Sequence, residues 1–154
     1  MVPLAEILDR RQQLRHRMRR EHIGAVYLTR PASVCYYSGF TGDESALLLT
    51  ARQALLMTDF RYREEAERSC CDTEVQIWRR SLAASAGERL AKLRVKCIGC
   101  EGTVLSAAAH KQLRRTARGC RVVLWDRPIQ EPRQQKSSWE LRQIRRALRV
   151  AEKA

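Results

Sequence analysis

The densest polar cluster in the sequence is Asp59-Phe60-Arg61-Tyr62, which lies where an apolar, strand-like run passes into a helical pattern. Strand ends in α/β proteins are favoured binding positions, and an aspartate there can also cap the following helix. In one interpretation Asp59 caps, Tyr62 packs and Arg61 forms a surface ion pair. In the other, Arg61 offers its planar guanidinium fork to an anion. Composition alone favours the first interpretation, because capping explains Asp59 without any ligand.

Six cysteines are the second potential source of chemistry: Cys35, Cys70, Cys71, Cys97, Cys100 and Cys120. Cys97 and Cys100 have the spacing of a zinc half-site or a redox pair. That stretch reads as a strand, however, and residues three apart on a strand point to opposite faces, so one metal ion would not bind both thiols. Cys70 and Cys71 are adjacent and do not form a second half-site. We therefore predict buried free cysteines, with a zinc or redox module as an alternative.

Motifs of known catalytic sites are missing from the sequence. The histidines His16, His22 and His110 do not pair with a carboxylate at metal-ligand spacing, and no Gly-x-Ser-x-Gly motif occurs. The glycines at 39 and 42 predict a tight turn, because the phosphate-binding patterns are missing. We expect no catalytic residue, metal ligand or cofactor in this chain.

The net charge of +13 would suit a polyanionic partner. Six arginines lie between Arg10 and Arg20, and seven cations between Arg133 and Lys153, both in segments with helical periodicity. Most of these cations fall opposite an apolar stripe, where a solvated helix face is charged anyway. We therefore do not favour nucleic-acid binding, and a stand-alone basic module for nucleic acid or an acidic protein is the alternative function. Neither an export signal nor about 18 consecutive apolar residues is present, so we expect a cytoplasmic protein without membrane contact.

Alternating strand and helix patterns predict an α/β fold with a mixed sheet of about six strands, covered on both faces. The predicted strands are 25–29, 46–50, 54–58, 73–78, 96–100 and 121–125. A helical stripe from Leu4 to Met18 ends near His22, with Gly24 as its expected cap. Further helices are expected over 31–38 (or a turn), after Asp59, over 82–93 and 106–116, and from 139 onward. Pro128 and Pro132 interrupt the pattern before that last helix, which has no stop signal.

Six segments in the right order resemble the creatinase/prolidase N-terminal domain, which precedes the "pita-bread" catalytic domain of Xaa-Pro aminopeptidases and prolidases. They are residues 10–15, 23–28, 36–42, 55–62, 98–101 and 133–144. Residues 36–42 resemble the family's Tyr-Leu-Ser/Thr-Gly-Phe-Thr-Gly, and residues 55–62 its Leu-x-Thr-Asp-x-Arg-Tyr. Two departures are local: Ser33-Val34 stands where the family often has Asn-Ile, and Tyr37 replaces a leucine.

The resemblance implies a three-layer, ribonuclease H-like fold. Residues 1–127 would be the N-terminal domain, and residues 128–154 a linker and the first helix before a catalytic domain that is absent here. Ala154 would then be a boundary rather than a natural end. The family hydrolyses the bond before proline with two divalent metal ions (Mn, Co or Zn) held in that catalytic domain, so this chain alone is expected to be inactive. The implied partners are its own catalytic domain, a second subunit in a homodimer, and proline-containing peptides. The stretch Asp59, Phe60, Arg61 and Tyr62 matches the family segment that contacts substrate across the dimer in some members.

Overall fold

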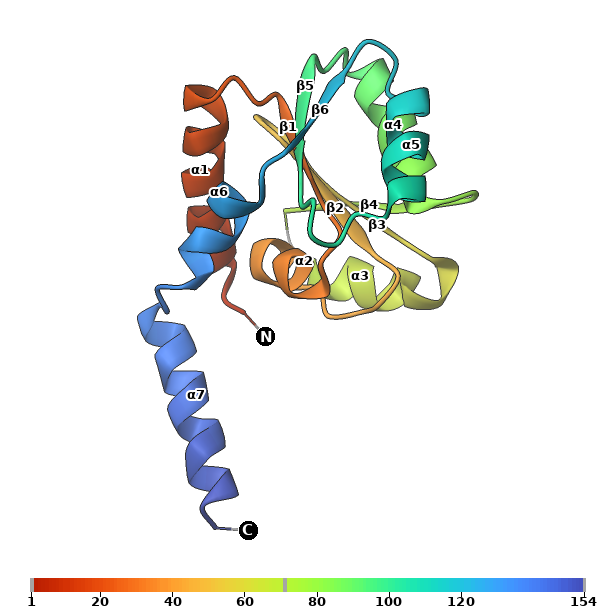
Figure 1. The fold of residues 1–154 in the computed structure, drawn as a ribbon. Helices are drawn as coiled ribbons and strands as arrows, with labels where there is room; N and C mark the ends of the chain where they lie inside the picture. The colour runs from red at the N-terminus through yellow and green to blue at the C-terminus, as the bar shows by residue number, and fades with distance from the viewer. Residues whose placement is uncertain (1, 71, 154) are drawn as a thin grey trace.

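One mixed sheet organises the computed structural model, which describes residues 2–70 and 72–153 (Figure 1). Among these residues, six strands lie in the order β4-β3-β2-β1-β5-β6. They are β1 (Ala25–Leu28), β2 (Ala46–Thr50), β3 (Ala54–Thr58), β4 (Glu74–Ile77), β5 (Cys97–Cys100) and β6 (Arg121–Leu124). Each predicted strand is confirmed with its ends within one residue.

β2 is the strand that runs against the others. It pairs antiparallel with β1 and with β3, whereas β3–β4, β1–β5 and β5–β6 are parallel pairs. The β2–β3 hairpin closes where the Thr50 hydroxyl accepts hydrogen bonds from the backbone of Arg52 and Gln53. The carboxyl ends of β1, β3, β4, β5 and β6 consequently meet at one edge of the sheet, and this edge carries the candidate site.

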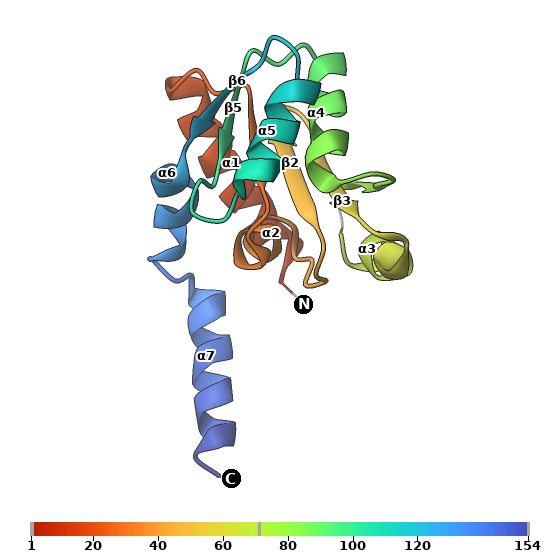
Figure 2. The same cartoon turned by 45° about the vertical axis from the view of Figure 1, so that its right-hand side comes forward.

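Helices cover both faces of the sheet (Figures 1 and 2). One face packs on α1 (Leu4–Arg20), α2 (Pro31–Ser38), α3 (Arg63–Ser69) and α6 (Asp126–Gln130), and the other on α4 (Leu82–Lys92) and α5 (Ala107–Thr116). Successive strand residues alternate between the two apolar cores, as Val26 and Tyr27 do. The expected three-layer α/β fold is confirmed.

The end of α1 differs from the prediction. The helix stops at Arg20, and His22 adopts the left-handed conformation (φ 55°) that we expected of Gly24. The Ile23 amide then donates to the Met18 carbonyl at 2.8 Å. Gly24 instead pairs with the Cys97 carbonyl, and a Cβ there would lie 3.2 Å from the side chain of Val95. Gly24 thus permits a close approach to β5 rather than a helix end.

Two arginines of α1 are buried, whereas periodicity assigned most of its cations to a solvated face. Arg11 is fully buried and donates to the carbonyls of Tyr37 (2.6 Å) and Asp72 (2.9 Å) and to the Thr73 hydroxyl (2.7 Å). Burial lowers the pKa of its guanidinium. Arg10 is only 5% exposed. Arg11 therefore joins α1 to α2 and to the loop before β4.

The chain stays packed through the two prolines. Ile129, in α6, is fully buried in the first core, and its carbonyl accepts a hydrogen bond from the Tyr37 hydroxyl at 3.0 Å. A short 3-10 helix, η2 (Glu131–Arg133), follows. Proline is tolerated in both because the first turn of a helix leaves its amides unpaired.

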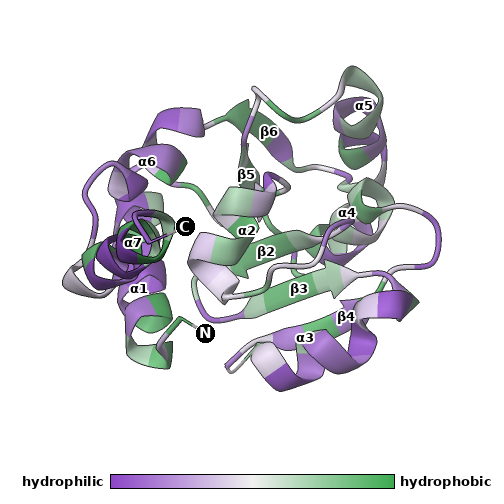
Figure 3. Cartoon of the chain, turned by 90° about the horizontal axis from the view of Figure 1, so that it is seen from below, coloured by the Kyte–Doolittle hydropathy of each residue, from purple (hydrophilic) through white to green (hydrophobic). Residues whose placement is uncertain are grey.

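The last helix, α7 (Ser138–Ala151), projects away from the body (Figure 1). Ser137 and Glu140 form a capping box at its start. Its apolar side chains remain exposed: Leu141 by 42%, Ile144 by 45% and Leu148 by 56%. Figure 3, which looks along this helix, shows hydrophobic and hydrophilic residues mixed in it. Ala154, where we expected a boundary, lies outside the described residues, as does Cys71.

Candidate functional site

The segment Asp59–Tyr62 leaves the carboxyl end of β3 and forms the short 3-10 helix η1 (Phe60–Tyr62) before α3. The buried Asp59 caps this turn, because its Oδ1 accepts a hydrogen bond from the Arg61 amide at 2.8 Å. Its Oδ2 accepts from Arg61 Nε at 2.9 Å and also from the Arg61 Nη2. The expected cap and ion pair are both present.

The Asp59–Arg61 pair shifts the acidity of both groups. The hydrogen bond from the Arg61 side chain lowers the pKa of Asp59, and the same bond raises the pKa of Arg61. The carboxylate is therefore charged throughout the neutral range. The Arg61 side chain nevertheless stays 59% exposed, and its Nη1 makes no hydrogen bond within the described residues. Asp59 thus orients the guanidinium while leaving a donor edge toward solvent.

The two aromatic residues of the turn behave differently. Tyr62 packs edge-to-face on Phe40, with ring centroids 6.0 Å apart, and the Arg61 Cζ lies 5.6 Å from the Tyr62 ring centroid. Packing therefore explains Tyr62, as one interpretation predicted. Phe60 is 78% exposed, which neither capping nor packing explains. The turn presents an exposed phenyl ring beside an oriented cation.

A second polar network closes the same edge at β1, β5 and β6, and sequence reasoning missed it. The buried Glu101 accepts hydrogen bonds from the Ser33 hydroxyl (2.7 Å) and the Arg30 amide (3.3 Å). Asp126 accepts from the Thr103 hydroxyl at 2.8 Å and from two backbone amides. The available signal was an acidic residue close behind two of these strands, because Glu101 directly follows β5 and Asp126 lies two residues after the end of β6. Both carboxylates have structural partners, so they hold the loops in place.

The arginines of α1 are largely used inside the fold. Besides Arg10 and Arg11, Arg15 donates to the Thr50 carbonyl at 3.0 Å, and Arg17 pairs with Glu131 at 2.7 Å. Continuous basic surface on α1 is correspondingly reduced, which weighs against a nucleic-acid interface there. The cations of α7 are exposed, on a helix whose apolar side chains are exposed as well.

Metal-ligating side chains do not gather in the parts of the chain that the structure describes. No group of three or more His, Cys, Asp or Glu side chains there could hold a metal ion. Cys97 faces the core under α1 and Cys100 the core under α4, which confirms that the pair points to opposite faces. Cys97 and Cys100 are buried free thiols, Cys70 is buried, and Cys35 and Cys120 are half-buried. In residues 2–70 and 72–153, no helix is long and apolar enough to cross a membrane.

Comparisons with known proteins agree with this geometry. The family profile of the Creatinase/Prolidase N-terminal domain matches residues 10–135. An uncharacterized peptidase, YqhT, from Bacillus subtilis (strain 168) is 23% identical over 143 residues, which cover 93% of this chain and 40% of YqhT. The chain thus spans about two fifths of that relative's length.

Solved structures show the same architecture. The N-terminal domain of the cytoplasmic peptidase PepQ from Mycobacterium tuberculosis H37Rv has a TM-score of 0.75 and 28% identity, over 80% of this chain and 97% of that one. An X-Pro aminopeptidase from Thermotoga maritima MSB8 has a TM-score of 0.84 and 24% identity, over 93% of this chain and 41% of that one. The Xaa-Pro dipeptidase from Bacillus anthracis has a TM-score of 0.81 and 20% identity, over 88% of this chain and 38% of that one. The fold, the profile match and these relatives together establish that the chain belongs to the creatinase/prolidase N-terminal domain family.

Proposed function

We propose that this chain is the non-catalytic N-terminal domain of an Xaa-Pro peptidase, and that it supports homodimerisation and access of proline-containing peptides to the active site. The observation that carries the proposal is the exposed Phe60–Arg61 turn, held by Asp59 at the edge of a family-typical sheet. Hydrolysis would belong to a catalytic domain with two divalent metal ions (Mn, Co or Zn). A cytoplasmic location is supported by the description of the Mycobacterium tuberculosis relative as a cytoplasmic peptidase.

The proposed division places residues 128–154 as the linker and first helix toward that catalytic domain. The family profile ends at residue 135, before α7 begins. The Mycobacterium tuberculosis N-terminal domain matches 80% of this chain, whereas the longer Thermotoga maritima aminopeptidase matches 93%. The exposed apolar side chains of α7 suit a helix that packs on a neighbouring domain.

The role proposed for Arg61 follows from its donors. A guanidinium has five N–H donors in a planar fork that fits a carboxylate in two parallel bonds. Asp59 uses the Nε and Nη2 groups and leaves Nη1 toward solvent. The carboxyl-terminal carboxylate of a short peptide would supply the matching acceptor, and Phe60 an apolar contact beside it. Arg61 would therefore favour substrates with a free carboxylate close to the scissile bond.

The proposal can be tested in a full-length peptidase that carries this domain, loaded with metal, by changing Arg61→Ala. We expect KM for a free Xaa-Pro dipeptide to rise about 10-fold, because a charge-assisted pair is lost, and KM for the C-terminally amidated peptide to stay unchanged. Arg63→Ala is the matched control, since Arg63 is an exposed arginine two residues away that pairs only with Glu67 among the described residues. An unchanged KM for the free peptide in Arg61→Ala would refute the role of Arg61.

Dimerisation and activity are tested separately. Sedimentation of the full-length protein should show a dimer, and Xaa-Pro hydrolysis should require added metal. A monomer would remove the proposed contact across subunits, whereas absence of Xaa-Pro hydrolysis would overturn the parent activity. Salt-sensitive binding of this chain to an anionic polymer would instead favour the alternative basic module.

A further inference from the structure

The segment that connects the α/β body to α7 is held by polar side-chain contacts rather than by a hydrophobic core. Residues 131–137 run beside α1, and a groove of about 660 Å³ lies between them, lined by α1, by Tyr36 and by this segment. Within it, Arg17 pairs with Glu131, and the Tyr36 hydroxyl donates to the Pro132 carbonyl at 3.3 Å. The segment from 133 to 139 makes no hydrogen bond or ion pair to the body within the described residues.

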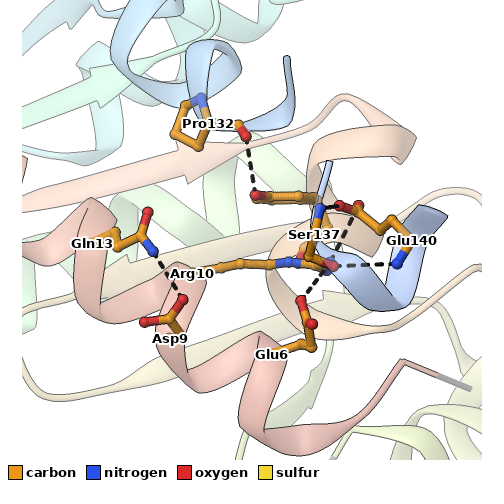
Figure 4. A network of polar contacts seen from close by, with 8 residues as sticks. Glu6, Asp9, Arg10, Gln13, Pro132, Ser137 and Glu140 are labelled. Atoms are coloured by element: carbon orange, nitrogen blue, oxygen red, sulfur yellow. Dashed lines mark hydrogen bonds and ion pairs between the residues drawn. The ribbon is translucent and has the colours of Figure 1, made fainter. Parts of the chain in front are cut away.

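One buried cation then contacts α7 itself (Figure 4). Arg10 Nη2 lies 3.2 Å from Glu140 Oε1 and 3.3 Å from Glu6 Oε2, and its Nη1 donates to the Tyr36 carbonyl at 3.1 Å. The Arg10 Cζ also lies 4.1 Å from the centroid of the Tyr36 ring. Three contacts from α1 and α2, one with Glu6 and two with Tyr36, thus fix the guanidinium before it meets α7.

Glu140 has two roles at this point. Its Oε2 accepts from the Ser137 amide at 2.9 Å and so closes the capping box, while its Oε1 faces Arg10. The same carboxylate therefore starts the helix and ties it to the body. Among the described residues, the Arg10–Glu140 ion pair is the one polar contact between α7 and the body.

We propose that Arg10 is a positioning residue that sets the direction of α7 relative to the α/β body. The Arg10 side chain is 5% exposed and that of Glu140 24%, so water and salt screen this pair less than they screen a surface pair. Tyr36 and Glu6 immobilise the Arg10 guanidinium. The position of its Nη2 group, which also pairs with Glu140, therefore determines where the first turn of α7 lies. The capping box fixes the Glu140 side chain within that turn, so the position of Arg10 also determines the direction of the α7 axis. This inference concerns contacts within the chain and stands or fails independently of the proposed peptidase.

The test is to measure residual dipolar couplings of backbone amides in the 154-residue chain. In the unmodified chain, α7 should share the alignment of the sheet. In Arg10→Gln, the α7 alignment should fall by about half or more relative to the sheet, because a helix without its anchor samples many directions. Backbone chemical shifts should keep α7 helical, which separates loss of direction from loss of structure.

Two further variants make the test decisive. Glu140→Gln retains the capping box, since glutamine also serves at that position, but removes the charge that faces Arg10, and it should likewise reduce α7 alignment. If Arg10→Gln destabilises the body, the α7 alignment in Glu140→Gln decides whether the ion pair sets the helix direction. Arg19→Gln, an exposed change on the same helix, should leave the alignment unchanged. The proposal is overturned if α7 aligns independently of the sheet in the unmodified chain, or if α7 keeps the alignment of the sheet in both Arg10→Gln and Glu140→Gln.

Discussion

Replacing Arg11 with methionine removes a cation but keeps a similar unbranched stem. The three acceptors that Arg11 serves belong to Tyr37, Asp72 and Thr73, which lie 26, 61 and 62 positions away in the sequence. The Tyr37 carbonyl is buried, whereas the bonds to Asp72 and Thr73 are only partly buried. After the substitution, water therefore does not reach the Tyr37 carbonyl, but it does reach the acceptors of Asp72 and Thr73.

The magnitude follows from these surroundings. A buried acceptor left without a donor costs about 1–3 kcal/mol, and each partly buried bond about 0.5–1 kcal/mol. Methionine carries no charge, so the desolvation cost of burying the Arg11 guanidinium disappears and offsets part of this loss in stability. We expect the free energy of unfolding to fall by about 3 kcal/mol, against a total of about 5–15 kcal/mol for a typical domain. At about 2–4 °C per kcal/mol for a chain of this size, Tm should fall by about 6–12 °C.

Urea unfolding followed by circular dichroism measures the change. Arg19→Met serves as the control, because Arg19 is exposed on the same helix and should change stability by less than about 0.5 kcal/mol. A loss below about 1 kcal/mol in Arg11→Met would mean that water replaces the lost donors, and the reasoning from burial would be wrong.

Three further predictions concern other parts of the chain. Ile129→Ala should lower the free energy of unfolding by about 2–5 kcal/mol, because the side chain is fully buried, whereas Leu148→Ala on the exposed α7 should change it by less than about 0.5 kcal/mol; urea melts compare the two. Burial alone would raise the pKa of Asp126, but hydrogen bonds from the neighbouring loop lower it overall. A carboxylate with a depressed folded-state pKa stabilises above its unfolded pKa of about 3.9 and loses that contribution as pH falls, so Asp126→Asn should flatten the decline of the urea midpoint below about pH 4. A decline as steep as in the unmodified chain would contradict this assignment. At pH 8 a thiol reagent should modify the half-buried Cys120 before Cys100, whose pKa burial raises to about 12, and mass mapping of the first labelled peptide checks the order.

The sheet could be predicted closely because its signal is local. Each strand is a short apolar or alternating run bounded by polar residues, and burial on both faces leaves little freedom in where it ends. The hairpin likewise followed from the short link between two such runs. The starts of α4 and α5 could also be predicted, because the capping residues Ser81 and Ser106 act on the turn that directly follows them and need no distant partner.

The errors share a different cause. Periodicity assigns arginines to solvent, yet Arg11 is paired with carbonyls from distant segments that no local pattern reveals. At the end of α1, glycine is the usual left-handed residue, but Gly24 was required for close approach to β5 and His22 took the strained position. At the candidate site, the cap at Asp59 was predictable from spacing alone. The positions of Glu101 and Asp126 after strands were visible in the sequence, but their partners were not, because those come from other strands and loops.

The pairing of β1 with β5 has a consequence for how the protein is made. Ala25 lies opposite Ile98, 73 positions later in the chain, so β1 has no neighbour on that side until β5 has been synthesised. The first four strands and their helices form a contiguous half, while β1 exposes an unpaired, apolar edge of the kind that promotes aggregation. Closing so long a loop also slows the search for native contacts. We therefore expect folding to be limited by docking of β5 and β6 onto a preformed amino-terminal half.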